Sequence, residues 1–134
     1  MDCIFCKIVA GELPAYKIYE DKRFLAFLDI NPVNKGHVLV IAKEHYQSFA
    51  ETPHDVLKDL IVKIQDVSKA MTEALGLKGF NVVNNNGAVA GQLVEHLHFH
   101  IIPRLAGDNL HPWPGKTFSD EEMKRTAENI SKQL

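Results

Sequence analysis

The chain has 134 residues, of which 46% are apolar and 24% charged, and its formal net charge is −2. This length and composition are ordinary for a folded domain with a real core, so we expect one domain over 1–134, including the tail 115–134. The balanced charge and the lack of a basic run predict no nucleic-acid partner and no membrane partner. Because the N-terminus lacks a signal-peptide layout and no apolar run reaches membrane-spanning length, we expect a cytoplasmic protein.

The two cysteines, Cys3 and Cys6, stand three residues apart near the N-terminus. This spacing without a secretory signal argues against a disulfide framework. A redox pair normally opens a helix after a core strand, and too few residues precede Cys3 for such a strand. The pair therefore fits half of a tetrahedral zinc site or two inert residues, and zinc would need two further ligands from elsewhere.

A β-hairpin is predicted after an N-terminal helical turn over 7–10. Residues 16–20 alternate as a strand, and the apolar run 24–28 returns as its partner. Asp29 follows that run, where its carboxylate can bond its own turn or accept hydrogen bonds from a sugar diol. In the second role, three apolar residues would form the walls around a base: Leu13, Phe27 and Ile30.

A nearly continuous apolar run over 37–41 predicts a central strand. His37 begins this run, where a histidine is more often structural than functional, and His45 follows it, suited to the surface or to zinc. Thr52 is placed to cap a long helix with its hydroxyl, just before a first-turn proline. Apolar residues then recur at three- and four-residue intervals up to Gly76, so this helix should bury one apolar stripe.

Strand 80–83 is predicted next, and it opens into the loop 84–92, which is rich in Asn and Gly. An ordinary hairpin connection explains this composition. Because the loop leads directly into a run of histidines, the side-chain amides of Asn85 and Gln92 are also candidates to donate hydrogen bonds to a phosphate.

The stretch 94–102 alternates three histidines with apolar residues. On a strand, successive side chains point to opposite faces, so His96, His98 and His100 would share one face at intervals of roughly 7 Å. A purely structural strand would rarely keep three histidines in register. The pattern predicts a site carried on a strand, and a metal ion is a rival ligand because His-x-His can present two imidazoles to it.

The C-terminal part of the chain is predicted to be irregular and then helical. Prolines on both sides of Trp113 exclude regular structure there. Ser119 and Glu122 form a capping box, and an amphipathic helix should then continue to about Lys132.

The order of these motifs resembles the histidine-triad (HIT) nucleotide-binding family, from Cys3 to about Trp113. The resemblance rests on the signature His-φ-His-φ-His-φ-φ, where φ is apolar, together with an acid, a histidine and an Asn/Gly/Gln lead-in. These residues are Asp29, His37, Asn85, Gly87, Gly91, Gln92 and 96–102. The Cys-x-x-Cys pair makes the chain similar to zinc-containing, prokaryotic-type members of the Hint-like branch.

The resemblance implies an α+β fold with a five-stranded antiparallel sheet and one long helix, to which the sequence adds a C-terminal helix. It implies a two-fold homodimer whose sheets join into one ten-stranded sheet, with the long helix in the interface. It also implies a structural zinc with four ligands: Cys3, Cys6, His45 and His96. Such a set is closed, so no catalytic metal is implied.

The resemblance further implies a hydrolase or transferase that acts at the α-phosphate of a purine nucleotide. His98 matches the nucleophile that forms a nucleotidyl intermediate, His100 a phosphate-binding histidine, and His37 a supporting histidine. The implied nucleotide-binding residues are Leu13, Phe27, Asp29, Ile30, Asn85, Gln92, Leu93, His98 and His100. At Leu93 the chain departs from Hint-like relatives, which usually carry Ser or Thr there.

We therefore expect a purine nucleoside phosphoramidase, which releases AMP or GMP from amine-linked nucleoside monophosphates. A neutral imidazole suits this chemistry without a catalytic metal. The alternatives are a dinucleoside polyphosphate hydrolase and a nucleotide-binding or scaffold protein with vestigial activity, an alternative that Leu93 keeps open. A zinc-dependent hydrolase is disfavoured because the implied zinc set is closed.

Overall fold

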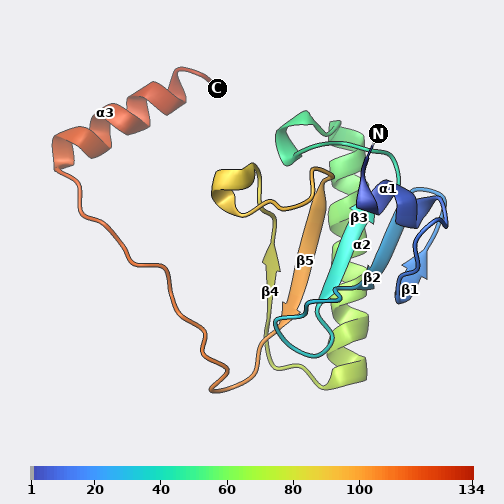
Figure 1. Ribbon diagram of the computed structural model, residues 1–134. Helices are drawn as coiled ribbons and strands as arrows, with labels where there is room; N and C mark the ends of the chain where they lie inside the picture. The colour runs from blue at the N-terminus through green and yellow to red at the C-terminus, as the bar shows by residue number, and fades with distance from the viewer. Residues whose placement is uncertain (1) are drawn as a thin grey trace.

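The computed structural model describes residues 2–134, and its centre is one five-stranded antiparallel sheet (Figure 1). The strands are β1 (Lys17–Glu20), β2 (Phe24–Leu28), β3 (Val38–Ala42), β4 (Phe80–Val83) and β5 (His98–Pro103). Their order across the sheet is β1-β2-β3-β5-β4, so β3 is central and buried along its whole length. The predicted α+β class and five-stranded sheet are confirmed.

The sheet is covered on both faces. The long helix α2 (His54–Leu75) lies along one face (Figure 1), where its apolar stripe packs against alternate residues of β2, β3 and β5. The short helix α1 (Ile4–Val9) packs on the other face against Leu25, Leu39 and Ile41. Side chains of β5 therefore alternate between these two environments, and the odd-numbered Phe99 and Ile101 belong to the core beneath α2.

The start of α2 differs from the sequence prediction. The Thr52 hydroxyl does not cap the helix; it donates to the carbonyl oxygen of Ser48, 2.8 Å away. A short 3-10 turn, Phe49–Glu51, precedes the helix and uses this hydroxyl in its own hydrogen bonding. The end of α2 is as predicted, because Gly76 adopts φ of 64° and its N–H bonds to the Thr72 carbonyl.

Helix α1 begins earlier than expected, at Ile4. The Cys3 sulfur caps the N-terminus of this helix, because it accepts a hydrogen bond from the Cys6 N–H at 3.2 Å. Strand β5 begins later than expected, at His98, which pairs with Ile41, because the N–H of Leu97 donates to the carbonyl oxygen of Tyr46 instead of to β3. This shift places His96 outside the strand.

The C-terminal tail leaves the sheet after β5 and carries helix α3 (Asp120–Ser131), which stands beyond the β4 edge in Figure 1. The predicted capping box of Ser119 and Glu122 is present. Because α3 lies apart from the sheet, the single domain over 1–134 stays a prediction. None of the helices within residues 2–134 has the length and apolar composition that a membrane span requires.

Candidate active site and metal centre

His98 is oriented by the backbone two residues before it. Its Nδ1 lies 2.7 Å from the carbonyl oxygen of His96, so Nδ1 carries the proton and donates it to that oxygen. The other nitrogen, Nε2, therefore keeps a free lone pair. Burial lowers the pKa of His98 below its ordinary value of 6.5 and holds the ring neutral. Neutrality and a fixed tautomer are what a nucleophilic imidazole requires.

His100 is oriented by a second chain of hydrogen bonds. The backbone N–H of Val33 donates to His37 Nδ1 at 3.0 Å, so the proton of His37 sits on Nε2. His37 Nε2 lies 2.9 Å from His100 Nδ1 and donates to it. The proton of His100 is thereby directed to its own Nε2. The site thus pairs a lone pair on His98 with an N–H donor on His100, and their ring centroids are 5.0 Å apart.

Asp29 supports this relay from the end of β2. One carboxylate oxygen, Oδ1, accepts the N–H of Asn31 at 2.8 Å, which is the turn-forming role that the sequence allowed. The other, Oδ2, lies 3.6 Å from His37 Nε2. Donor atoms of Asp29, His37 and His100 converge within 4.8 Å, as in a metal site. A metal on His37 Nε2 would force the proton onto Nδ1, against the N–H of Val33, so the hydrogen bonding favours a relay here.

Burial and the neighbouring His98 and His37 lower the pKa of His100 from 6.5 to about 4. A folded-state pKa below the unfolded value means that the folded protein binds fewer protons. We therefore expect the stability contributed by neutral His100 to be complete above pH 6.5 and to be lost as the pH falls toward 4. The melting temperature, followed by differential scanning fluorimetry, should decrease across this interval.

The variant His100→Asn should show a smaller decrease than the wild type, because it lacks the group that titrates. His111→Asn is the matched control, since His111 is exposed on the tail, and its profile should follow the wild type. Parallel curves for all three proteins would contradict the assignment of the acid sensitivity to His100.

The three residues expected to surround a base differ in exposure. Ile30 is 78% exposed and Leu13 is 38% exposed, so both offer free apolar surface. Phe27 is only 3% exposed and packs edge-to-face on Phe5, with ring centroids 5.5 Å apart. Phe5 also contacts the His98 ring at 5.1 Å between centroids. Phe27 thus reaches the site as a support beneath Phe5, a link for which the sequence offered no signal.

The loop before β5 is held together by Gln92. Its Oε1 accepts the N–H of Gly87, and its Nε2 donates to the carbonyls of Gln47 and Val94. Both amide hydrogens of Gln92 are therefore occupied in this structure, and its role as a phosphate donor stays a prediction. Its packing beneath the loop fixes the approach of the chain to the histidines.

Two neighbouring asparagines differ in their contacts. Asn84 donates from Nδ2 to the carbonyl oxygen of His98 at 3.0 Å, and it was not selected from the sequence. Three consecutive asparagines carry no pattern that distinguishes this one. Asn85, which was selected, packs near Gly91, and its role as a phosphate donor stays a prediction.

The four expected zinc ligands converge in a cluster beside the histidine strand. Donor atoms of Cys3, Cys6, His45 and His96 all lie within 4.8 Å of one another. The Sγ-to-Nδ1 distances are 3.4 Å for Cys3–His96, 3.4 Å for Cys6–His45 and 3.6 Å for Cys6–His96. Sulfur and nitrogen ligands on one tetrahedral zinc stand about 3.5 Å apart, so these distances fit the ion.

Two further observations favour a cation in this cluster. His96 Nε2 lies 2.8 Å from the Ala42 carbonyl and donates to it, so the lone pair on Nδ1 faces the sulfurs. Burial and the adjacent Cys3 raise the pKa of the Cys6 thiol to about 11, so two thiolates here require a compensating charge. The three histidines of the predicted strand are therefore divided: His96 lies with Cys3, Cys6 and His45, whereas His98 and His100 lie side by side.

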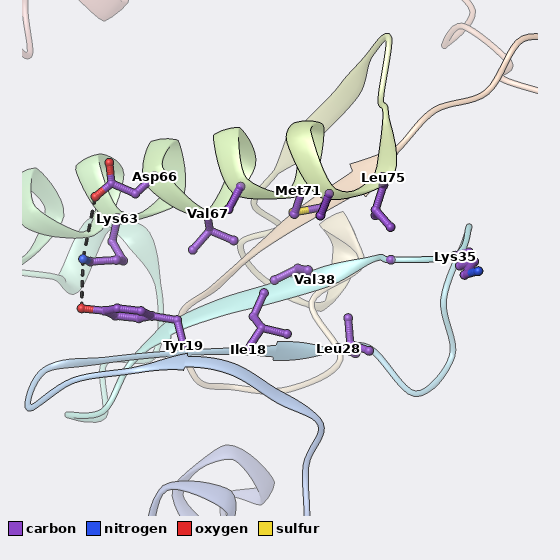
Figure 2. Close-up of a pocket in the computed structure, with 13 residues that line it drawn as sticks. Ile18, Tyr19, Leu28, Lys35, Val38, Lys63, Asp66, Val67, Met71 and Leu75 are labelled. Carbon is purple, nitrogen blue, oxygen red and sulfur yellow. Dashed lines mark hydrogen bonds and ion pairs between the residues drawn. The ribbon is translucent and has the colours of Figure 1, made fainter.

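A cavity of about 590 Å³ lies elsewhere, between α2 and the β1–β2 side of the sheet (Figure 2). Its walls are mainly apolar and include Ile18, Leu28, Val67 and Met71, and none of the site histidines lines it. The hydrogen bonds that orient His37, His98 and His100 lie on the face of the sheet opposite α2, so we place the candidate site on that face. A second cavity, about 500 Å³, borders the metal cluster and includes Leu93.

Comparison with known proteins places the chain in a family. The model of the HIT domain family matches residues 10–107. The chain belongs to the histidine-triad family. A HIT-like protein of Methanocaldococcus jannaschii is 57% identical over 79% of this chain and 81% of its own length. The adenosine 5'-monophosphoramidase of Schizosaccharomyces pombe is 44% identical over 100% of this chain and 99% of its own.

Solved structures of HIT proteins share the fold. A HIT protein of Bacillus subtilis superimposes with a TM-score of 0.90 at 39% identity, covering 100% of this chain and 98% of its own. A zinc-bound histidine-triad protein of Mycobacterium smegmatis gives a TM-score of 0.78 at 38% identity, covering 100% and 96%. The resemblance stated from the sequence motifs is confirmed.

Proposed function

We propose that this HIT protein is a nucleotide hydrolase, specifically a purine nucleoside phosphoramidase that releases AMP or GMP from amine-linked nucleoside monophosphates. The observation that carries the proposal is the tautomer of His98, whose free Nε2 lone pair lies beside the Nε2–H donor of His100. The similarity to the fission-yeast adenosine 5'-monophosphoramidase supports the substrate class.

The proposed reaction has two steps at the α-phosphorus. His98 Nε2 forms a bond to phosphorus while the bond from phosphorus to the amine nitrogen breaks, and the amine leaves with a proton taken from solvent. Nδ1–H stays bonded to the His96 carbonyl, which stabilises the positive charge on the ring. Water then forms a bond to phosphorus while the bond from phosphorus to His98 Nε2 breaks; its proton passes to solvent, AMP is released, and the electron pair that returns to Nε2 restores neutral His98.

The residues around His98 would position the nucleotide. His100 Nε2–H would donate to a non-bridging phosphate oxygen and stabilise its developing charge. Asp29 would accept from the ribose hydroxyls, and Leu13 and Ile30 would contact the base. The loop that carries Asn85 and Gln92 would lie along the phosphate. No step requires a catalytic metal.

The Cys3, Cys6, His45 and His96 cluster would hold a structural zinc, which ties the N-terminal helix to the segment before β5. A zinc-bound neighbour among solved HIT structures supports this choice of metal. The two cysteines are free thiols, as zinc ligation requires, and such thiols persist in the cytoplasm. We therefore propose a cytoplasmic protein. The formal net charge of −2, without a basic run, supports the further proposal that it has neither a nucleic-acid nor a membrane partner.

We also propose a homodimer in which two sheets join at β4. Within residues 2–134, β4 is an edge strand that pairs only with β5. Its residues Phe80 and Val82 are exposed, and an open edge with apolar side chains is suited to pairing with another strand. Antiparallel pairing of two β4 strands would give the expected ten-stranded sheet.

The test is turnover of a fluorogenic adenosine phosphoramidate, combined with intact-mass analysis of the protein during turnover. Release of AMP and a mass increase of one nucleotidyl group would support the proposal. Faster hydrolysis of a diadenosine polyphosphate would favour the dinucleoside polyphosphate hydrolase instead. AMP binding without turnover or adduct would favour the scaffold protein.

Leu93 gives the scaffold alternative its physical basis, because it is 94% exposed, lines the cavity that borders the metal cluster, and supplies no hydroxyl. We expect Leu93→Ser to raise kcat for the phosphoramidate, by up to about 10²-fold if the hydroxyl acts only in the transition state. Leu93→Ala is the control, since it removes the same apolar surface without adding a donor. Equal rates for the two variants would show that the hydroxyl contributes nothing.

A further inference from the structure

A polar cluster outside the reactive histidines ties the loop between β2 and β3 to the end of β5. Asn34 Nδ2 donates to the carbonyl oxygen of Pro103 at 2.8 Å and to Asp108 Oδ2 at 2.9 Å. Asp108 Oδ1 accepts a hydrogen bond from Arg104 Nη2 at 2.8 Å. We call these four residues, Asn34, Pro103, Arg104 and Asp108, the loop clamp. The side-chain amide of Asn34 thus joins two segments that are 69 residues apart in the chain.

The carboxylate that holds Asn34 is itself fixed. The side chains of Arg104 and Asp108 are only 18% and 10% exposed. The hydrogen bond from Arg104, together with that from the Leu105 N–H, lowers the pKa of Asp108 to about 2 and keeps its carboxylate ionised. The Asp108 N–H bonds to the Leu105 carbonyl at 3.2 Å and closes a tight turn, in which Gly107 adopts φ of 77°. Hydrogen bonds to an ionised acceptor are stronger than those between neutral groups, so the turn holds Asn34 firmly.

The loop that the clamp holds also carries the groups that fix the tautomer of His37. The His37 N–H donates to the Asn34 carbonyl at 3.1 Å, and the adjacent Val33 N–H donates to His37 Nδ1 at 3.0 Å. The second bond places the His37 proton on Nε2, from which it reaches His100 Nδ1. If the loop moved at Asn34, the Val33 N–H would leave Nδ1 and both tautomers of His37 would be populated.

We propose that Asn34 is a positioning residue for the reaction, because the loop clamp fixes the tautomer of His37 and thereby the donor that His100 offers to the phosphate. Within residues 2–134, the clamp side chains form no hydrogen bond with His98 or His100, so their effect passes through His37. The inference rests on the proposed function for the reaction that is affected, whereas the effect on the His37 tautomer stands apart from it.

Nitrogen-15 NMR of the histidine rings tests the tautomer directly. In the wild type we expect one protonated ring nitrogen on His37, Nε2, and one acceptor, Nδ1; loss of these signals in His37→Asn assigns them. Asn34→Ala removes both amide hydrogen bonds and should give averaged signals for the two nitrogens. Lys35→Ala is the matched control, since Lys35 is exposed on the same loop and should leave the spectrum unchanged. A pure Nε2–H tautomer in folded Asn34→Ala would overturn the proposal.

Hydrolysis of the adenosine phosphoramidate tests the consequence for the reaction. Asn34→Ala should lower kcat by about tenfold, which is less than the loss of about 10² or more expected when a whole transition-state donor is removed. KM should change less than kcat, because the His100 donor acts mainly on charge that develops in the transition state. A variant that had only lost stability would keep the kcat of its folded fraction, so an unchanged kcat per folded molecule would refute the positioning role.

Asp108→Asn provides a milder second variant, which decides the question if Asn34→Ala fails to fold. It keeps the side-chain volume and removes the charge that Arg104 and Asn34 contact, so the tautomer and kcat should change in the same direction by a smaller factor. Wild-type values in both measurements would overturn the proposal. An inactive wild type whose His37 tautomer still depends on the clamp would refute the phosphoramidase function and support the action of the clamp on His37.

Discussion

Replacement of His98 by alanine is expected to lower kcat/KM for an adenosine phosphoramidate by at least about 10⁴-fold. The change removes the proposed nucleophile, and the remaining site residues depend on that nucleophile for their effect on the rate. The nucleotidyl adduct detected by intact-mass analysis should also be absent from this variant. The neighbouring His100 donor and the Asp29 carboxylate remain, so AMP binding measured by calorimetry should weaken by no more than about tenfold.

The matched control for this loss is His111→Ala, which removes an exposed imidazole of the tail and should leave the rate unchanged. Circular dichroism should show the same fold in both variants. If His98→Ala retained a tenth of the wild-type rate, an imidazole attack by His98 would be excluded, and water activated elsewhere in the site would have to be considered.

Substitution Cys3→Ser is expected to remove zinc and to lower the melting temperature by more than about 10 °C. A closed metal site contributes its binding free energy to folding, and about 3 kcal/mol would produce this shift in a chain of this size. The serine hydroxyl can still cap α1, as the Cys3 sulfur does now, so the loss reports on the metal rather than on the helix cap.

Metal analysis by inductively coupled plasma mass spectrometry should find one zinc per wild-type chain and almost none in Cys3→Ser. Activity per folded molecule should remain within about tenfold of wild type, because the four ligands leave no open position for substrate chemistry. Wild-type protein that is fully folded and free of metal would refute the structural role. Loss of activity as severe as in His98→Ala would instead indicate that the metal takes part in the reaction.

Features that depend on local periodicity were predictable from the sequence. The stripe of α2, its end at Gly76 and the Ser119 capping box each depend on residues within a few positions of one another, and each is confirmed. The alternation in β5 also correctly separated the core residues from His98 and His100.

Features that depend on distant partners were not predictable in the same way. The Thr52 hydroxyl has two acceptable roles, and the preceding 3-10 turn decides between them. The tautomer of His37 depends on the N–H of Val33, which becomes its donor only when the loop folds. Asn84 reaches His98 through the pairing of β4 with β5, and the sequence alone does not distinguish it from Asn85.

The central strand β3 (Val38–Ala42) connects both halves of the site through its two ends. His37 precedes its first residue and orients His100, whereas the carbonyl of Ala42 at its last residue holds the ring of His96. Five buried residues, about 3.3 Å apart along the strand, set the separation between these two anchors. The site is therefore ordered before any nucleotide arrives, and the entropy lost on binding belongs mainly to the ligand.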